Sequence, residues 1–147
     1  MTNVRMGAMA QVVASATRPV SAPPERVLGF LRDYGARGSI LPHQYSDFRV
    51  EDGDAIAYHF SSGGRERDFQ LLPEESPTGL IERDQLSSFV QTWTVSETAT
   101  GSTVTVEGAW QGSGGIGGFF ERLFAPLSLR RIYGEMLDKL ASALQAP

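Results

Sequence analysis

The last third of the chain carries one long hydrophobic pattern with the spacing of an α-helix. Apolar residues recur every three or four positions over about thirty residues, at Ile116, Phe119, Phe120, Leu123, Phe124, Leu127, Ile132, Met136, Leu137, Leu140 and Leu144. Pro126 lies inside this run and is expected to kink the helix, because proline lacks a backbone N–H. A single long helix cannot bury its apolar face alone, so the rest of the chain must supply a surface that covers it.

The middle of the chain, residues 47–110, alternates with the period of two that is typical of β-strands. Turn signals separate the alternating segments at residues 51–54, 61–64, 73–79 and 100–101. The alternating apolar positions are Phe48, Val50, Ile56, Tyr58, Phe60, Phe69, Leu71, Phe89, Trp93, Val95, Val104, Val106 and Trp110. Short strands that follow one another without helices predict an antiparallel sheet.

The first part of the chain supplies one more strand and two short helices. Residues 11–20 suit a strand, which Pro19 restricts to an edge or an end of the sheet. Pro23 and Pro24, followed by Glu25, predict the first turn of a short helix, and a second short turn covers residues 36–41. The expected class is therefore α+β, with a twisted antiparallel sheet curled around the long helix and a space between the two.

The size and composition of the chain fit one domain. Its 147 residues include 41% hydrophobic residues, too many for a disordered chain. We expect residues 1–10 to form a flexible extension and residues 11–145 to form the domain. The first ten residues lack the apolar core of a secretory signal, and no apolar run is long enough to cross a bilayer, so we expect a cytoplasmic protein.

Charge and motif content argue against several functional classes. The net charge of −4 gives no basic face for nucleic acid, and the absence of cysteine excludes thiolate chemistry. His43 and His59 lack the spacing of a metal site, so no metal or cofactor is expected. Residues 112–117 match G-x-G-x-x-G, but no second parallel strand follows to complete a dinucleotide site. These glycines instead suggest mobility at the mouth of a pocket.

Several polar residues share strand faces with apolar ones. Arg67 alternates with Phe69, Gln91 lies between Phe89 and Trp93, and Arg83 lies between Ile81 and Gln85. A buried guanidinium or amide needs an internal partner, such as Glu82, Asp84 or Glu107, or a wet cavity that is open to a ligand. The alternative is a packed core with arginines at its edge. Weak candidates for an acid or base are Tyr58, Arg67 and His43.

Two segments resemble the START-like superfamily, also called SRPBCC, which includes the major birch pollen allergen. Residues 20–33, VSAPPERVLGFLRD, are similar to its opening strand and proline-capped helix, and residues 114–127, GGIGGFFERLFAPL, resemble its bacterial polyketide cyclase/dehydrase-like branch. The resemblance implies a helix-grip fold, in which a seven-stranded antiparallel sheet grips the C-terminal helix around a ligand cavity. It would place these residues around the ligand: Ile56, Tyr58, Phe60, Arg67, Phe69, Arg83, Gln91, Trp93, Trp110, Phe120, Leu123, Phe124 and Leu127.

Three functions remain open at this point. The first is the binding of a small hydrophobic or amphipathic metabolite, such as a lipid, an aromatic compound or a polyketide-like molecule. The second is a cyclase or dehydratase that confines a reactive chain in one folded conformation. The third is a stress or protein-interaction module without a ligand. A monomer or a homodimer fits each of them, because the fold alone does not determine function.

Overall fold

The computed structural model describes residues 11–111 and 126–145, which form an α+β fold. The first strand is followed by a short helix and a 3-10 helix, then by six more strands and the C-terminal helix. The elements are β2 (Gln11–Val20), α1 (Pro24–Leu31), η2 (Tyr34–Ile40), β3 (Tyr45–Val50), η3 (Asp52–Asp54), β4 (Ile56–Ser62), β5 (Arg65–Ser76), β6 (Gly79–Asp84), β7 (Val90–Thr98), β8 (Gly101–Gln111) and α3 (Pro126–Gln145). This order confirms the predicted one.

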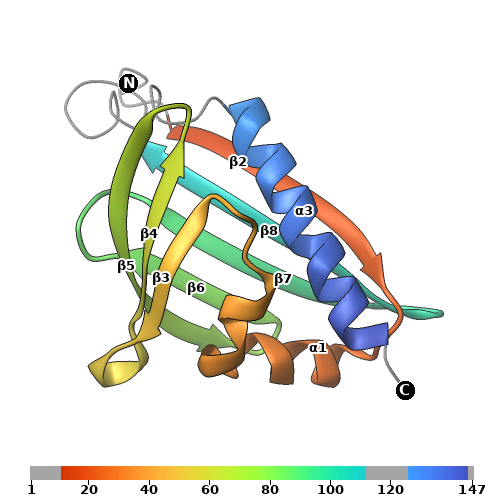
Figure 1. The fold of residues 1–147 in the computed structure, drawn as a ribbon. Coiled ribbons are helices and arrows are strands. Elements are labelled where there is room, and N and C mark those ends of the chain that lie inside the picture. Colours follow the sequence, from red (N-terminus) through yellow and green to blue (C-terminus); the bar gives the residue numbers. More distant parts are fainter. Residues whose placement is uncertain (1–10, 112–125, 146–147) are drawn as a thin grey trace, which may run out of the picture.

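The strands form one antiparallel sheet of seven strands in the order β2-β8-β7-β6-β5-β4-β3. Strands β3 to β8 are each paired with their neighbours in sequence, as hairpins require. The exception is β2, which lies at one edge of the sheet and pairs with the last strand, β8, from Gln11↔Gln111 to Val20↔Ser102. The sheet is curved, so that β3, β4 and β5 rise beside α3 (Figure 1). The helix-grip architecture predicted from the sequence is therefore present.

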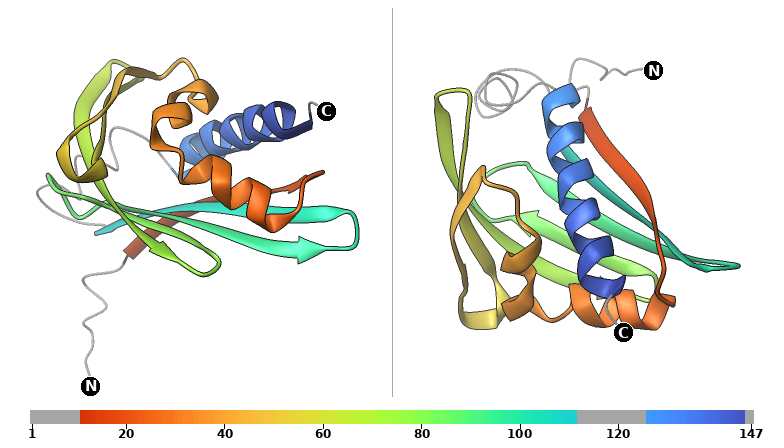
Figure 2. Two further views of the ribbon diagram at one scale, coloured as in Figure 1. Left: turned by 90° about the horizontal axis from the view of Figure 1, so that it is seen from below. Right: turned by 45° about the vertical axis from the view of Figure 1, so that its right-hand side comes forward.

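Helices α1, η2 and α3 lie on one face of this sheet, as the view from below shows (Figure 2). Helix α3 packs mainly against β2, while α1 and η2 cover the end of the sheet beside it. The apolar stripe of α3 is buried against the inner face, at Leu129, Ile132, Tyr133, Met136, Leu137, Leu140 and Leu144. In the described part of the chain, no helix is long and apolar enough to cross a membrane.

One proline lies at a place that the sequence analysis predicted differently. Pro73 was expected to begin a long turn, but β5 continues through it to Ser76. The pairing of β5 with β4 ends at Leu71, so Pro73 lies where one side of the strand has no neighbour and the missing N–H costs no ladder bond. Pro126 is the first described residue of α3, and the residues before it, on which its predicted kink depends, lie outside the described ranges.

Glycine matters most where β6 meets β7. An ideal Cβ atom on Gly79 would lie 1.8 Å from the carbonyl oxygen of Trp93. By contrast, a Cβ atom on the exposed Gly29 of α1 would meet nothing within 4 Å. The close approach of the two strands therefore depends on glycine at position 79, whereas position 29 only loses helix propensity.

We expect Gly79→Ala to lower the free energy of unfolding by about 1–3 kcal/mol, because the methyl group overlaps the backbone of the neighbouring strand. The matched variant Gly29→Ala should raise it by up to about 1 kcal/mol, as in other helix interiors. Urea unfolding followed by circular dichroism measures both values. Equal effects of the two substitutions would contradict this account of the strand spacing.

Candidate functional site

A row of aromatic side chains crosses the inner face of the sheet from β3 to β8. The rings of Tyr45 and Tyr58 lie 5.0 Å apart, and those of Tyr58 and Phe69 lie 5.4 Å apart. The row continues through Phe89, 5.3 Å from Phe69, to Trp110, 6.4 Å from Phe89. Such edge-to-face and tilted pairs give the curved sheet a continuous apolar lining opposite α3.

Three tyrosines bring hydroxyl groups into this lining. Tyr45, Tyr58 and Tyr133 come from β3, β4 and α3, and we call them the tyrosine cluster. Burial is the main cause that raises the pKa of each above its ordinary value, and the proximity of Tyr45 adds to this effect at the other two. All three phenols therefore keep their protons at neutral pH. They can donate hydrogen bonds but cannot act as bases.

Only one member of the tyrosine cluster has a hydrogen-bond partner within the described residues. The Tyr133 hydroxyl donates to Oε1 of Gln91 over 2.8 Å. An ideal Cβ atom on Gly108 would lie 2.6 Å from the same hydroxyl, so glycine on β8 leaves the room that Tyr133 needs. In this part of the chain, the structure gives the hydroxyls of Tyr45 and Tyr58 no hydrogen bond. Two donors therefore remain for another molecule.

A buried ion pair lies deeper in the interior. The guanidinium of Arg37 on η2 contacts both carboxylate oxygens of Glu82 on β6, over 2.8 and 3.1 Å. The side chains are 4% and 0% exposed, respectively. Arg37 also donates to the carbonyl oxygen of Leu31, and its guanidinium carbon lies 4.8 Å from the ring centre of Trp93. Bidentate geometry and additional partners are what a buried pair needs to offset desolvation.

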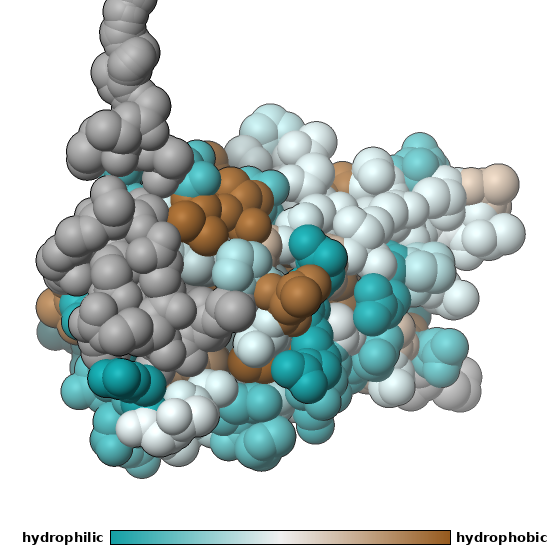
Figure 3. All heavy atoms as spheres, turned by 90° about the horizontal axis from the view of Figure 1, so that it is seen from above, coloured by the Kyte–Doolittle hydropathy of each residue, from teal (hydrophilic) through white to brown (hydrophobic). Residues whose placement is uncertain are grey.

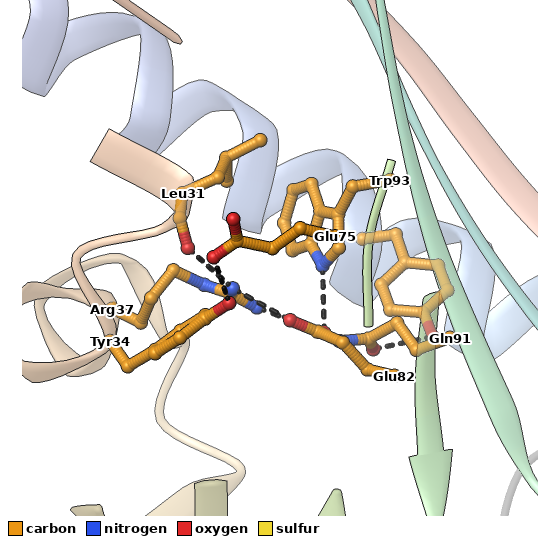
Figure 4. A network of polar contacts seen from close by, with 8 residues as sticks. Leu31, Tyr34, Arg37, Glu75, Glu82, Gln91 and Trp93 are labelled. Carbon is orange, nitrogen blue, oxygen red and sulfur yellow. Dashed lines mark hydrogen bonds and ion pairs between the residues drawn. The ribbon is translucent and has the colours of Figure 1, made fainter. Parts of the chain in front are cut away.

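Glu82 gathers further donors from β7. Its Oε1 atom accepts hydrogen bonds from Nε2 of Gln91 and Nε1 of Trp93, each over 2.9 Å. Gln91 in turn accepts the proton of Tyr133, so one continuous hydrogen-bonded path connects η2, β6, β7 and α3 (Figure 4). We call Arg37, Glu82, Gln91 and Tyr133 the polar chain. It joins the buried ion pair to the tyrosine cluster.

A cleft opens at the rim of the interior, between the first turns of α3 and the loop before β3. Its volume is about 220 Å³, and it is lined by His43, Gln44, Ser62, Ser128, Arg131, Ile132 and Glu135. Gln44 and Ile132, which line this rim cleft, directly precede Tyr45 and Tyr133 in sequence. Seen from above, hydrophobic groups on the described surface form small separate patches among more polar ones (Figure 3).

Most predicted ligand-facing residues of the strands lie on the inner face. The buried ones are Ile56, Tyr58, Phe60, Phe69, Gln91, Trp93 and Trp110. Arg67 is half-buried at the end of the same face and donates to the carbonyl oxygen of Leu86. His43 is an exposed residue of the rim cleft. Phe120, Leu123, Phe124 and the glycines of residues 112–117 lie outside the described ranges.

Two predicted positions are wrong. Arg83 was expected to share the inner face, but Glu82 and Asp84 point inward, so strand alternation places Arg83 on the outer, exposed face. There its Nη2 atom lies 4.0 Å from Oε1 of Glu74. Leu127 was expected to face the sheet, but it is 69% exposed on the first turn of α3, where Leu129 and Ile132 occupy the buried side. Glu82 and Asp84 occupy the buried positions beside Arg83, and Leu129 and Ile132 occupy the buried positions near Leu127.

Sequence reasoning missed Arg37, Tyr45 and Tyr133. Arg37 lies in a short segment without periodicity, so only its contact with Glu82 reveals that it is buried. Tyr133 shares the helical spacing of Leu129 and Met136, and that signal could have identified it. Glu82 had been considered as an internal partner of Gln91, and the structure confirms this contact.

His59 lies across the sheet from this site. Its two ring nitrogens contact carboxylates of β5, with Asp68 at 2.7 Å and Glu66 at 3.0 Å. The hydrogen bond to Asp68 is the main cause that raises the pKa of His59 above its ordinary value. Among the described residues, no group of three or more His, Asp or Glu side chains is arranged to hold a metal ion.

We expect protonated His59 to stabilise the fold at low pH. Because its pKa is higher in the folded state, the contribution is complete below the unfolded value of about 6.5 and is lost as the pH rises through the folded value. Melting temperatures of the wild type and His59→Asn, measured from pH 5.5 to pH 9 in about half-unit steps, should therefore differ most at the acidic end. Asp68→Asn should lower the pKa of His59 in an NMR titration, and an unchanged value would refute the assignment.

We expect Arg37→Met to lower the free energy of unfolding by about 3–5 kcal/mol, because it leaves the carboxylate of Glu82 buried without its counter-charge. The double variant Arg37→Met/Glu82→Gln should recover part of this loss, since it buries no charge at this position. Urea unfolding of the wild type, both single variants and the double variant completes the cycle. Simple additivity of the two single losses would show that the pair is not coupled.

Comparisons with known proteins identify the family to which this architecture belongs. The family model described as polyketide cyclase / dehydrase and lipid transport matches residues 11–145. The chain is similar to the KanY protein, known from an NMR solution structure, with 36% identity, a TM-score of 0.84, and coverage of 94% of this chain and 100% of that one. No curated protein matches the chain.

More distant structures share the fold. TTHA0849 from Thermus thermophilus is 17% identical with a TM-score of 0.74, covering 91% of this chain and 97% of that one. The di-domain ARO/CYC StfQ from the steffimycin biosynthetic pathway is 10% identical with a TM-score of 0.66; 92% of this chain matches 51% of StfQ. With a family match that spans every described residue, the chain belongs to the polyketide cyclase / dehydrase and lipid transport family.

Proposed function

We propose that the protein binds a small hydrophobic or amphipathic molecule between α3 and the inner face of the sheet. The observation that carries this proposal is the tyrosine cluster. Its Tyr45 and Tyr58 hydroxyls lie within the aromatic lining without a hydrogen bond from the described residues. Each hydroxyl can donate one hydrogen bond, and a ligand would supply an acceptor for it.

The rim cleft supports this proposal as the way in. Its lining includes Gln44 and Ile132, the sequence neighbours of Tyr45 and Tyr133, and it combines polar side chains with Ile132 at about 220 Å³, a size for the polar end of an amphipathic molecule. The apolar part of the ligand would then contact the aromatic row, where burial supplies most of the affinity. The family description, which includes lipid transport, is in keeping with such a ligand.

The second candidate function is a cyclase or dehydratase. The family description and the likeness to StfQ motivate it, although that likeness extends only to the fold. The same phenols favour it chemically, because protonated hydroxyls in a dry site can donate hydrogen bonds to a carbonyl oxygen as negative charge develops there. In this interpretation Tyr58 would polarise the substrate and the aromatic lining would hold it folded.

Ligand binding is tested with the purified protein and a panel of fatty acids, flavonoids and naphthalene derivatives. At least one class should raise the melting temperature and give a mass increase in native mass spectrometry. Tyr58→Phe should weaken that binding by about 2- to 10-fold, the worth of one hydrogen bond, and leave the fold intact. An unligated mass and an unchanged melting temperature across the whole panel would refute the proposal.

The two functions are separated by the fate of the bound compound. Incubation of the wild type with a linear poly-β-ketone mimic, followed by chromatography and mass spectrometry, shows whether a cyclised or dehydrated product forms faster than in buffer. A binder returns the compound unchanged. A cyclase should lose at least about ten-fold in rate in Tyr58→Phe if the phenol stabilises the transition state.

A further inference from the structure

The polar chain fixes the direction of every hydrogen bond along its length. The carboxylate of Glu82 can only accept hydrogen bonds, so the part of the Gln91 amide that faces it must be the NH₂ group. The carbonyl oxygen of Gln91 then faces Tyr133 and can only accept. The single proton of the Tyr133 hydroxyl is therefore committed to Gln91.

Because its proton is used in the hydrogen bond to Gln91, Tyr133 can only accept a hydrogen bond from another group. A phenol oxygen that has donated its proton keeps lone pairs, which can only receive a hydrogen bond. Tyr45 and Tyr58 are in the opposite condition, because their protons are not used within the described residues. The tyrosine cluster therefore presents one acceptor from α3 and two donors from the sheet.

The buried charged side chains of the inner face are already engaged by partners within the protein. Arg37 and Glu82 neutralise each other, and both are almost completely buried. The third buried charged side chain, Asp84, accepts hydrogen bonds from the backbone N–H of Gln70 and the hydroxyl of Ser87. A charged group brought in by a ligand would have to be desolvated against these satisfied partners, which is unfavourable.

We propose that the polar chain makes Tyr133 a hydrogen-bond acceptor toward the ligand, so that the interior selects a neutral apolar molecule carrying both a hydroxyl and a carbonyl group. This inference rests on the proposed binding function and specifies the chemistry of the ligand. The hydroxyl donates to Tyr133, and the carbonyl accepts from Tyr58 or Tyr45. Gln91 acts as a positioning residue, because it sets the polarity of Tyr133 through Glu82.

The test compares four probes of similar size: 2-methylnaphthalene, 2-naphthol, 2-acetylnaphthalene and 1-(6-hydroxynaphthalen-2-yl)ethanone. Their dissociation constants are measured by calorimetry with the full chain. The hydroxy-ketone should bind most tightly, by about 3- to 10-fold over each probe with one polar group, because it makes one more hydrogen bond. If the four probes bind equally, or if none of them binds while another compound of the panel does, the binding function stands and the polarity inference is wrong. If no compound of the panel binds either, the binding function itself fails.

Three variants locate the effect. Tyr133→Phe should weaken 2-naphthol by about 3- to 10-fold and leave 2-acetylnaphthalene unchanged, since the latter can only accept a hydrogen bond. Gln91→Met releases the proton of Tyr133, so 2-acetylnaphthalene should bind more tightly relative to 2-naphthol than in the wild type. Tyr34→Phe is the matched control, because its hydroxyl bonds to Glu75 outside the tyrosine cluster, and the ratio should not change.

Circular dichroism and the melting temperature establish that each variant is folded. If Gln91→Met does not fold, Tyr133→Phe decides the question, because it keeps the ring and its packing. An equal loss for 2-naphthol and 2-acetylnaphthalene in Tyr133→Phe would overturn the inference, since it would show that Tyr133 contributes contact area and no hydrogen-bond polarity.

Discussion

Glu82 is the constraint on which the interior of this protein depends. A carboxylate without solvent contact requires a counter-charge and several donors, and Arg37 of η2 and Gln91 and Trp93 of β7 supply them. Because Arg37 belongs to η2, the same requirement holds the segment after α1 against the sheet. Meeting it therefore fixes both the core and the position of the loop that leads to the rim cleft.

The direction of the hydrogen bonds connects the burial of Glu82 to the proposed recognition of a ligand. Glu82 orients Gln91, and the carbonyl oxygen of Gln91 accepts the hydrogen bond of the Tyr133 hydroxyl, so a charge on β6 determines which hydrogen bonds a side chain on α3 can make. The neighbouring tyrosines add donors to an aromatic surface that is otherwise apolar. An interior of this kind can orient a small molecule by a few polar contacts while apolar burial provides affinity.

Family membership sets the fold and leaves the chemistry open. The likeness to KanY shows a shared fold, and the chemistry of this chain depends on the side chains that line its sheet and C-terminal helix. In this chain the inner face carries aromatic and aliphatic side chains, the hydroxyls of three tyrosines and a buried ion pair. This composition is the basis for the proposal that the ligand is neutral.

Alternation and helical spacing were sufficient to predict most of the architecture. The strand faces of Ile56, Phe69 and Trp93 followed from a period of two, because pleating forces successive side chains to opposite sides. The same rule failed for Arg83, because an alternation of apolar and polar residues does not itself tell which face is buried when charged residues occupy both. Leu127 shows the equivalent limit at the end of a helix.

The sequence by itself determined the order of elements, the antiparallel sheet and the need for that sheet to cover one long helix, since these follow from local periodicity and apolar burial. Only the tertiary structure decided that Arg37 meets Glu82, that Tyr45 packs against Tyr58 and that Tyr133 donates to Gln91. These residues are far apart in sequence and follow no shared spacing. Their meeting depends on strand order and on the curvature of the sheet, which bring distant side chains together in ways that no local pattern encodes.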